Sequence, residues 1–76
     1  MFLSIEREKM TFSEHLLKLR NGRRLNQEDI ARELGITARG YRNYEHGLRE
    51  PPLSTLIALA DFYDLSLDEL VCRKRQ

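Results

Sequence analysis

Cysteine is almost absent from this 76-residue sequence, which contains Cys72 alone, so no disulfide within the chain can stabilise the fold. No apolar run approaches the roughly 18 residues that a membrane-spanning helix needs. Charged residues follow Met1 too early for a secretion signal, beginning with Glu6 and Arg7. We therefore expect a cytoplasmic protein in a reducing compartment, with no role at a membrane.

Motifs typical of enzymes and cofactor sites are also absent. The sequence has no glycine-rich phosphate loop, no cysteine and histidine spacing of a metal site, and no supported pair of nucleophile and base. His15 lies beside Glu14 in a predicted helix, where a solvated histidine is the simpler interpretation. We predict that the protein is not an enzyme and uses no cofactor, no metal and no small-molecule ligand.

The length allows one domain, and the composition is that of a globular protein. Apolar residues make up 41% of the chain and charged residues 33%. A core of this size is small, so without a disulfide the fold depends on packing, helped by a second copy if the chain dimerises. We expect a domain over 11–72, an N-terminal arm over 1–10 that is mobile or pairs in a dimer, and a basic tail over 73–76.

The charges nearly balance overall but are distributed unevenly along the sequence. The formal net charge is +1. Residues 20–49 contain seven arginines and four acidic residues, whereas residues 50–70 contain five acidic residues and no basic one. Residues 73–75 are all basic. A nearly neutral chain with this arrangement can still present one basic face to a polyanion.

Capping residues and the spacing of apolar residues predict an all-α fold of five short helices with no strand. Thr11 and Glu14 have the spacing of a capping box, and Ser66 and Glu69 repeat it before the fifth helix. The other expected boundaries are an end of the first helix near Asn21 and Gly22, a second helix from Asn26 to Gly35, a third from Thr37 to about His46, and a fourth that begins at Pro52.

Apolar residues at helical spacing give each predicted helix one face that is directed at the core. Gly35 and Gly47 suit helix ends because glycine readily adopts a positive φ. The expected inward residues are Phe12, Leu16 and Leu19 with Leu17 partly buried, then Ile30, Ala31 and Leu34, then Tyr41 and Tyr44, then Leu53, Leu56, Ile57, Ala60 and Tyr63, and finally Leu67, Leu70 and Val71.

The second and third predicted helices meet the requirements of a helix-turn-helix motif. Two helices that cross at a steep angle need a small residue at the crossing and a glycine in the turn. Ala31 and Gly35 occupy these positions. A plain helical hairpin that has this spacing by chance is the alternative. Counted from Gln27, the fourth, eighth, tenth, fifteenth and eighteenth residues should face the shared core, and they are Ile30, Leu34, Ile36, Tyr41 and Tyr44.

Six short stretches carry a resemblance to a known family. They are residues 25–31 (LNQEDIA), 34–37 (LGIT), 41–47 (YRNYEHG), 49–51 (REP), 55–63 (TLIALADFY) and 66–70 (SLDEL). Over residues 14–71, about three quarters of the chain, the sequence resembles the phage repressor and Cro-type helix-turn-helix family, which is XRE-like and lambda-repressor-like. The resemblance implies a compact five-helix DNA-binding domain, usually a homodimer, that binds an operator and regulates transcription.

The third predicted helix is expected to enter the major groove, because only that groove admits a helix and presents an unambiguous pattern of donors and acceptors. Residues that point away from the tyrosine core face would then meet the bases. Arg39 can donate two hydrogen bonds to guanine, Asn43 can pair with adenine, and Ala38 can touch a thymine methyl group. Ordinary solvated side chains are the alternative. The predicted base-reading residues are Ala38, Arg39, Arg42 and Asn43.

Residues near the ends of these two helices are expected to bind phosphates, which fix the position of a protein on DNA rather than its sequence preference. The second helix offers free N–H groups at its start, and the family places a contact at Gln27. His46, Arg49 and the Gly47 amide can bind the next phosphates. Alternatively, His46 only complements the helix dipole and Arg49 pairs with Glu50. The predicted phosphate contacts are Gln27, Thr37, His46 and Arg49.

The resemblance also implies a structural ion pair between Arg20 and Glu45 that links the first and third helices. An Arg20 free in solvent is the alternative. Two residues depart from the family pattern. Gly40 stands where serine or threonine is more usual, and should weaken the third helix by roughly 0.5–1 kcal/mol relative to alanine. Tyr41 replaces a common aliphatic residue, and its hydroxyl needs a partner or water.

The functional prediction is a homodimeric transcriptional regulator, in the first instance a repressor, that occupies an inverted-repeat operator on double-stranded DNA. Two recognition helices would lie about 34 Å apart on such a site. Leu67 and Val71 of the fifth helix, or the N-terminal arm, would form the dimer contact. Because no sensing domain fits in 76 residues, control would depend on protein concentration and dimerisation.

An antitoxin-like interaction module is the alternative function. In that case the acidic residues 50–70 would dock a partner protein, which the chain neutralises, and DNA binding would serve autoregulation. Both interpretations keep the DNA-binding helix, so they differ in whether a second protein binds the chain.

Overall fold

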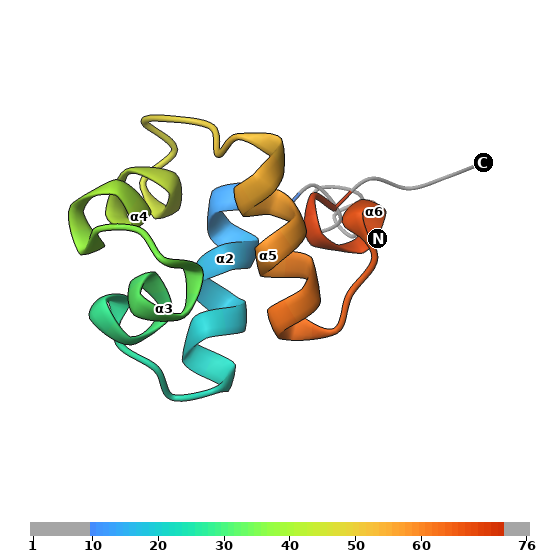
Figure 1. Cartoon of the computed structure of the whole chain (residues 1–76). Helices are drawn as coiled ribbons and strands as arrows, with labels where there is room; N and C mark the ends of the chain where they lie inside the picture. The colour runs from blue at the N-terminus through green and yellow to red at the C-terminus, as the bar shows by residue number, and fades with distance from the viewer. Residues whose placement is uncertain (1–9, 73–76) are drawn as a thin grey trace, which may run out of the picture.

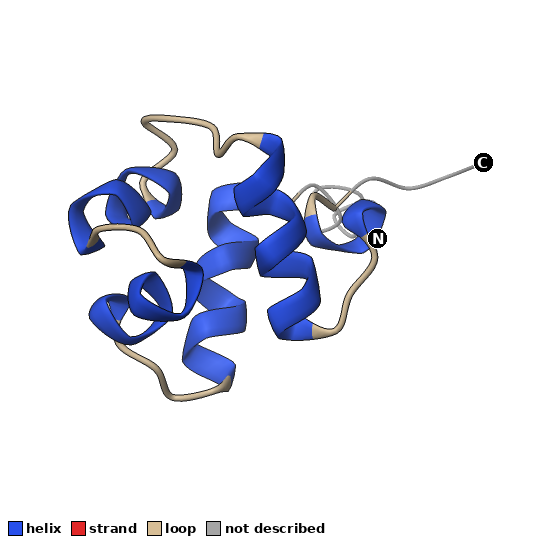
Figure 2. Ribbon diagram, viewed as in Figure 1, coloured by secondary structure: helices blue, strands red, loops and turns tan. Residues whose placement is uncertain are grey.

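The computed structural model describes residues 10–72, and this part of the chain is all-α (Figure 1). Short loops join the helices, and no strand occurs between residues 10 and 72 (Figure 2). The predicted fold class is therefore confirmed. The basic tail 73–76 and residues 1–9 of the predicted arm lie outside the described residues. The helices are α2 (Phe12–Gly22), α3 (Gln27–Leu34), α4 (Ala38–Glu45), α5 (Leu53–Tyr63) and α6 (Leu67–Leu70).

The helices form two unequal ends on either side of a central pair. Figure 1 shows α3 and α4 at one end, α2 and α5 in the middle, and α6 at the other end. The outer side of α4 is not covered by another helix of the described chain. Within residues 10–72 no helix is long and apolar enough to cross a membrane, and no cluster of side chains could hold a metal ion.

Local hydrogen bonds define where the helices begin, as the sequence predicts. The Thr11 hydroxyl accepts from the Glu14 amide at 3.2 Å, and the Glu14 carboxylate accepts from the Thr11 amide at 3.0 Å. This reciprocal arrangement satisfies N–H groups that have no partner inside the helix. The same capping box is formed by Asn26 with Asp29 before α3 and by Ser66 with Glu69 before α6.

The other helix boundaries follow the predictions, with one exception. Gly35 ends α3 in the left-handed region, with φ 73°, and His46 is the C-cap of α4. Pro52 was expected as the first residue of the fourth helix, but this was wrong by one position. With ψ 166° Pro52 is extended and serves as the N-cap, so α5 begins at Leu53. Arg24 and Asp64 have φ of 57° and 59°, although they are not glycines.

Every helix contributes one large side chain to the core. Each of these residues has no exposed surface, and together they connect all five helices of the described chain. Burial of large apolar side chains is the main source of stability in a domain without disulfides. The central residues are Leu16 of α2, Ile30 of α3, Tyr41 of α4, Leu59 of α5 and Leu70 of α6.

The predicted core face of α5 was partly wrong. Leu53 and Ile57 were expected inside but are 63% and 45% exposed, and Thr55 and Leu59 are buried instead. This helix is apolar on most of its circumference, so periodicity alone did not identify the inward face. Leu56 is partly buried, whereas Ala60 and Tyr63 are buried as predicted. Leu17 of α2 and Leu67 of α6 are also exposed, contrary to expectation.

His15 is a packing residue rather than a solvated one, so that interpretation was wrong. Its Nδ1 lies 2.9 Å from the main-chain oxygen of Leu70, and the contact is partly buried. A carbonyl oxygen only accepts, so His15 Nδ1 must carry the proton and donate it. The hydrogen bond connects α2 to the short α6. At the other end of α2, the guanidinium of Arg23 lies 5.2 Å from the ring centroids of Phe62 and Tyr63, which links this end of α2 to α5.

Candidate nucleic-acid interface

The turn between α3 and α4 has the local geometry that a helix-turn-helix motif requires. The Gly35 amide donates to the Arg32 carbonyl at 3.2 Å, and the Ile36 amide donates to the Ala31 carbonyl at 3.0 Å. Both bonds satisfy carbonyl groups at the end of α3. Ala31, at the predicted crossing point, is 2% exposed. The motif predicted from the sequence is therefore present in α3 and α4.

The glycine at position 40 lies at the cap of α4. Thr37 Oγ1 accepts a hydrogen bond from the Gly40 amide at 3.0 Å. A Cβ atom at position 40 would lie 3.2 Å from the same oxygen, which is a tight contact. A side chain here would require a shift of a few tenths of an ångström, and the same cap forms around Glu14, which has a Cβ, so the cap accommodates glycine without requiring it.

The polar face of α4 projects outward as predicted, with one exception. Arg39 is exposed, and Arg42 and Asn43 are partly exposed, whereas Tyr41 on the opposite face is fully buried. Ala38 packs against the core cluster, so the expectation that it points away from the core was wrong. A helix places residues three apart on the same side, which aligns Ala38 with Tyr41.

A buried carboxylate, that of Glu45, joins α3 and α4 to the central α2. Arg20 donates to Glu45 from Nε to Oε2 at 2.5 Å and from Nη2 to Oε1 at 3.1 Å. The two side chains are only 13% and 4% exposed. Tyr41 Oη donates to Glu45 Oε2 at 2.6 Å, and Gln27 Nε2 donates to Oε1 at 3.1 Å. These bonds fill the roughly four acceptor positions of a carboxylate, and they realise the structural ion pair that the resemblance implied.

The network sets the protonation of its members. Burial alone would raise the pKa of Glu45, but hydrogen bonds from Arg20, Tyr41 and Gln27, together with the charge of Arg20, hold it below its ordinary value. The hydrogen bond to Glu45 raises the pKa of Arg20, against the opposing effect of burial. Burial and the neighbouring carboxylate raise the pKa of the Tyr41 hydroxyl. Near neutral pH the pair is therefore fully ionised and Tyr41 donates.

Gln27 and Arg42 are also joined to each other. The Arg42 Nε–H donates to the side-chain oxygen of Gln27 at 3.1 Å, across the space between α4 and α3. Gln27 was predicted as a phosphate contact and Arg42 as a base-reading residue. The observed bond puts the two side chains in direct contact before any ligand binds.

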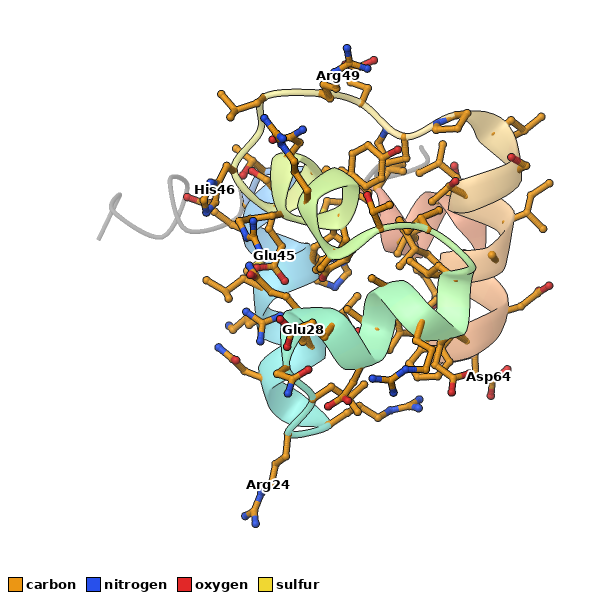
Figure 3. The ribbon with its side chains drawn as sticks, turned by 60° about the vertical axis from the view of Figure 1, so that its left-hand side comes forward. Arg24, Glu28, Glu45, His46, Arg49 and Asp64 are labelled. Carbon is orange, nitrogen blue, oxygen red and sulfur yellow. The ribbon has the colours of Figure 1, made fainter. Side chains whose placement is uncertain are left out.

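The other predicted phosphate-binding residues lie around α4. In Figure 3, His46 and Arg49 project outward from the end of α4 and the following loop. Both are exposed, and within residues 10–72 Arg49 forms no ion pair with Glu50, which was the alternative role. Thr37 is exposed at the other end of α4. Leu67 and Val71, the predicted dimer contacts, lie far from this surface in α6 and just beyond it.

Two of the residues that donate hydrogen bonds to Glu45, Tyr41 and Gln27, were not predicted as its partners from the sequence. The partner that Tyr41 required is Glu45, four residues later, and helical i and i+4 spacing already brings such side chains together. The bonds that Gln27 makes to Glu45 and Arg42 span 18 and 15 residues. No local pattern indicates contacts at such separations, which depend on how α3 packs against α4.

Comparisons with known proteins agree with this geometry. The helix-turn-helix family model matches residues 16–70. The uncharacterised regulator YqaE of Bacillus subtilis is 47% identical over 60 residues, which are 79% of this chain and 52% of that protein. The cryptic phage CTXphi transcriptional repressor RstR of Vibrio cholerae is 42% identical over 60 residues, 79% of this chain and 54% of the repressor.

A solved structure shows the same fold. The crystal structure of a transcriptional regulator from Listeria innocua superposes with a TM-score of 0.82 at 33% identity, over 87% of this chain and 62% of that one. The chain thus spans about half the length of the curated relatives it matches. These relatives are named as regulators, in agreement with the prediction that the chain is not an enzyme. The chain belongs to the Cro/C1-type, or XRE-like, helix-turn-helix family.

Proposed function

We propose that this chain is a sequence-specific DNA-binding transcriptional regulator that inserts α4 into the major groove. The observation that carries the proposal is the division of α4 into a buried face and an outer face. Tyr41 is fully buried, whereas Arg39 is exposed and Asn43 partly so, and no other helix of the described chain covers the outer side of α4. A surface helix held rigidly from behind is what reading base edges requires.

Base recognition is assigned to the outer face of α4. Arg39 would donate to guanine O6 and N7, Asn43 would pair with adenine, and Arg42 would contribute a further cation at the groove. Each bidentate contact is expected to contribute about 1–3 kcal/mol of discrimination. Ala38 retains some exposed surface, so its contact with a thymine methyl group stays a prediction.

Phosphate binding is assigned to the flanks of α4. Thr37, His46 and Arg49 lie at or beyond its ends and are exposed. Gln27, at the start of α3, was the fourth predicted phosphate contact, but both ends of its amide are hydrogen-bonded within the protein, to Glu45 and to Arg42. Each phosphate that is bound should steepen the dependence of log affinity on log salt by about 0.9.

The proposed assembly is a homodimer on an inverted-repeat operator. Leu67 is 41% exposed, and Val71 lines a mainly apolar hollow with Phe12, Glu50, Pro51 and Leu56. Leu67 lies in α6 and Val71 directly follows it, at the end of the molecule that lies away from α4 in Figure 1. Regulation would follow from occupancy of the operator, by excluding RNA polymerase in a repressor or by recruiting it in an activator.

Fluorescence anisotropy with the upstream DNA of the chain's own gene tests the proposal. We expect saturable binding by the wild type, and a loss for Arg39→Ala and Asn43→Ala that is confined to the specific duplex. Lys18→Ala is the control, because it removes an exposed cation from α2 rather than α4. Equal losses on specific and random DNA would contradict base readout. Absence of saturable binding at low salt, on this DNA and on a pool of random palindromic sequences, would overturn the proposal.

The antitoxin-like module remains the second candidate, for one reason. Leu53 and Ile57 are exposed apolar residues within the acidic segment 50–70, which is the surface expected to dock a partner protein. Co-purification of the chain with the product of a neighbouring gene, lost on Leu53→Lys and Ile57→Lys, would favour this function. A homodimer alone would favour the regulator.

A further inference from the structure

Three side chains form a continuous hydrogen-bonded chain from the protein interior to the outer side of α4. Glu45 is 4% exposed and accepts from Gln27 Nε2 at 3.1 Å. The other end of the Gln27 amide, its oxygen, accepts from Arg42 Nε at 3.1 Å. Arg42 is partly exposed, and Nε is the one guanidinium donor for which the described residues supply a partner. The buried carboxylate is thus connected to an outer cation through one amide.

The chemistry of Glu45 and Arg42 determines which side chain can bridge them. A carboxylate only accepts hydrogen bonds and a guanidinium only donates them. A bridging side chain must therefore donate at one end and accept at the other. The amide of Gln27 does both, and it has a single productive orientation, with nitrogen toward Glu45 and oxygen toward Arg42. A carboxylate at position 27 would repel Glu45, and an ammonium could not accept from Arg42.

Glu45, the buried end of this series of hydrogen bonds, is itself held in place. Arg20 holds both carboxylate oxygens of Glu45, and Tyr41 donates to one of them. The carboxylate therefore cannot rotate to follow the amide, and the amide must adjust to it. The orientation set at the buried end is passed on to the guanidinium of Arg42.

We propose that Gln27 is a positioning residue for DNA binding, which acts through Arg42 by holding its guanidinium in place before DNA arrives. The inference rests on the proposed function, because it concerns how that function's DNA surface is prepared. An arginine side chain has many rotamers, and ordering it on binding reduces affinity. A hydrogen bond already made in the free protein lowers that loss. The role differs from direct phosphate binding, which the resemblance implied for Gln27.

The first test uses the free protein and NMR. Exchange of the Arg42 Nε–H with water should be several-fold slower than exchange of the Arg39 Nε–H. Gln27→Met keeps the length of the side chain and removes both hydrogen bonds, so it should bring the two exchange rates together. Equal rates in the wild type would overturn the inference without any DNA measurement.

The second test is a double-mutant cycle in DNA affinity. Gln27→Met should weaken binding about 2- to 10-fold when Arg42 is present, and change it less than about 2-fold in an Arg42→Ala background. The same loss in both backgrounds would show that Gln27 acts on DNA by itself, and would overturn the inference. No loss in either background would also overturn it. The lost bond to Glu45 is common to both backgrounds, so any general effect on folding cancels in the cycle.

The control is Glu28→Met, which changes the neighbouring position of α3 outside the hydrogen-bonded chain. Its effect on affinity should be the same with and without Arg42. The outcomes are separate from those of the proposed function. If the wild type binds no DNA, the regulator proposal fails while the NMR result still stands. If the wild type binds and the cycle shows no coupling, only the inference about Gln27 fails.

Discussion

The two ends of the molecule are held together by different kinds of interaction. At the α3–α4 end, Glu45 accepts hydrogen bonds from residues of α2, α3 and α4, with Arg20 as its charged partner. At the other end, where α6 packs against the central α5, packing dominates: Leu59 and Leu70 are fully buried, and Ile57 remains exposed. Hydrogen bonds depend on the direction of donor and acceptor, whereas the hydrophobic effect depends only on how much apolar surface is buried. We infer that the first end is built to fix the orientation of its side chains, whereas the second is held by packing and leaves apolar surface for contact.

The largest expected effect comes from breaking the buried network. Glu45→Ala should reduce the free energy of unfolding by about 3–5 kcal/mol, because it leaves a largely buried Arg20 without its counter-charge. Urea unfolding followed by circular dichroism measures this loss. Arg32→Ala is the control, since Arg32 is 72% exposed and its pair with Asp29 spans 3.5 Å. That change should cost less than about 1 kcal/mol, and similar losses for both variants would contradict the comparison.

Leu70→Ala probes the other end and should cost about 3 kcal/mol. The reason is different, because the variant removes a fully buried side chain and leaves a cavity without exposing a charge. Leu67→Ala, three residues earlier in the same short helix, removes a side chain that is 41% exposed and should cost much less. Hydrogen exchange should show α6 opening in the first variant while α3 and α4 keep their protection. If α4 lost as much protection as α6, the two ends would unfold together rather than independently.

Acid should weaken the α3–α4 end through Glu45. Its pKa in the folded protein is lowered, below an ordinary value of about 4.3 for the unfolded chain. The unfolded chain therefore takes up the proton first. The stability that ionised Glu45 contributes is complete above about pH 4.3 and is lost as pH falls through the folded pKa.

Comparing the wild type with Glu45→Gln separates the contribution of Glu45 to the pH dependence of stability from that of the other acidic residues. The gap in unfolding free energy between the wild type and Glu45→Gln should narrow as the pH is lowered from about 7 to about 3. Urea titrations at several pH values measure it. A gap that stays constant over this range would show that ionised Glu45 does not stabilise the fold.

Features set by neighbouring residues were predictable from the sequence. Thr11, Asn26 and Ser66 begin helices through hydrogen bonds to residues three positions later, so these three helix starts were predicted correctly. The turn at Gly35 and the outward position of Arg39 on α4 were correct for the same reason.

Features that depend on how the helices pack were harder to predict from the sequence. The apolar circumference of α5 concealed which side faces inward, and Leu53 was misassigned. Ala38 was misassigned because it lies at the margin of the core face of α4. The contact of Gln27 with Arg42 depends on how two helices are oriented in space. The predicted roles of the α4 residues toward DNA remain predictions.

The smallest expected effect is a gain, and it concerns the end of α5. Asp64 has φ 59° and lies at the C-cap of a helix with no basic residue in its last turn. Figure 3 shows its side chain at the surface, away from α4. Two penalties therefore coincide: a left-handed backbone on a residue with a Cβ, and a negative charge at the negative end of the helix dipole. Asp64→Asn removes the charge alone and should add about 0.3–0.5 kcal/mol.

Asp64→Gly removes both penalties and should add about 1 kcal/mol, which raises the melting temperature by roughly 4–8 °C in a domain of this size. Thermal unfolding of the three proteins should therefore give the order glycine, asparagine, aspartate, from most to least stable. The gain should not alter the exchange rate of the Arg42 Nε–H, because that group belongs to the opposite end. A stabilisation that also changed Arg42 would show that the two ends are coupled through the central helices, and the division between them would have to be abandoned.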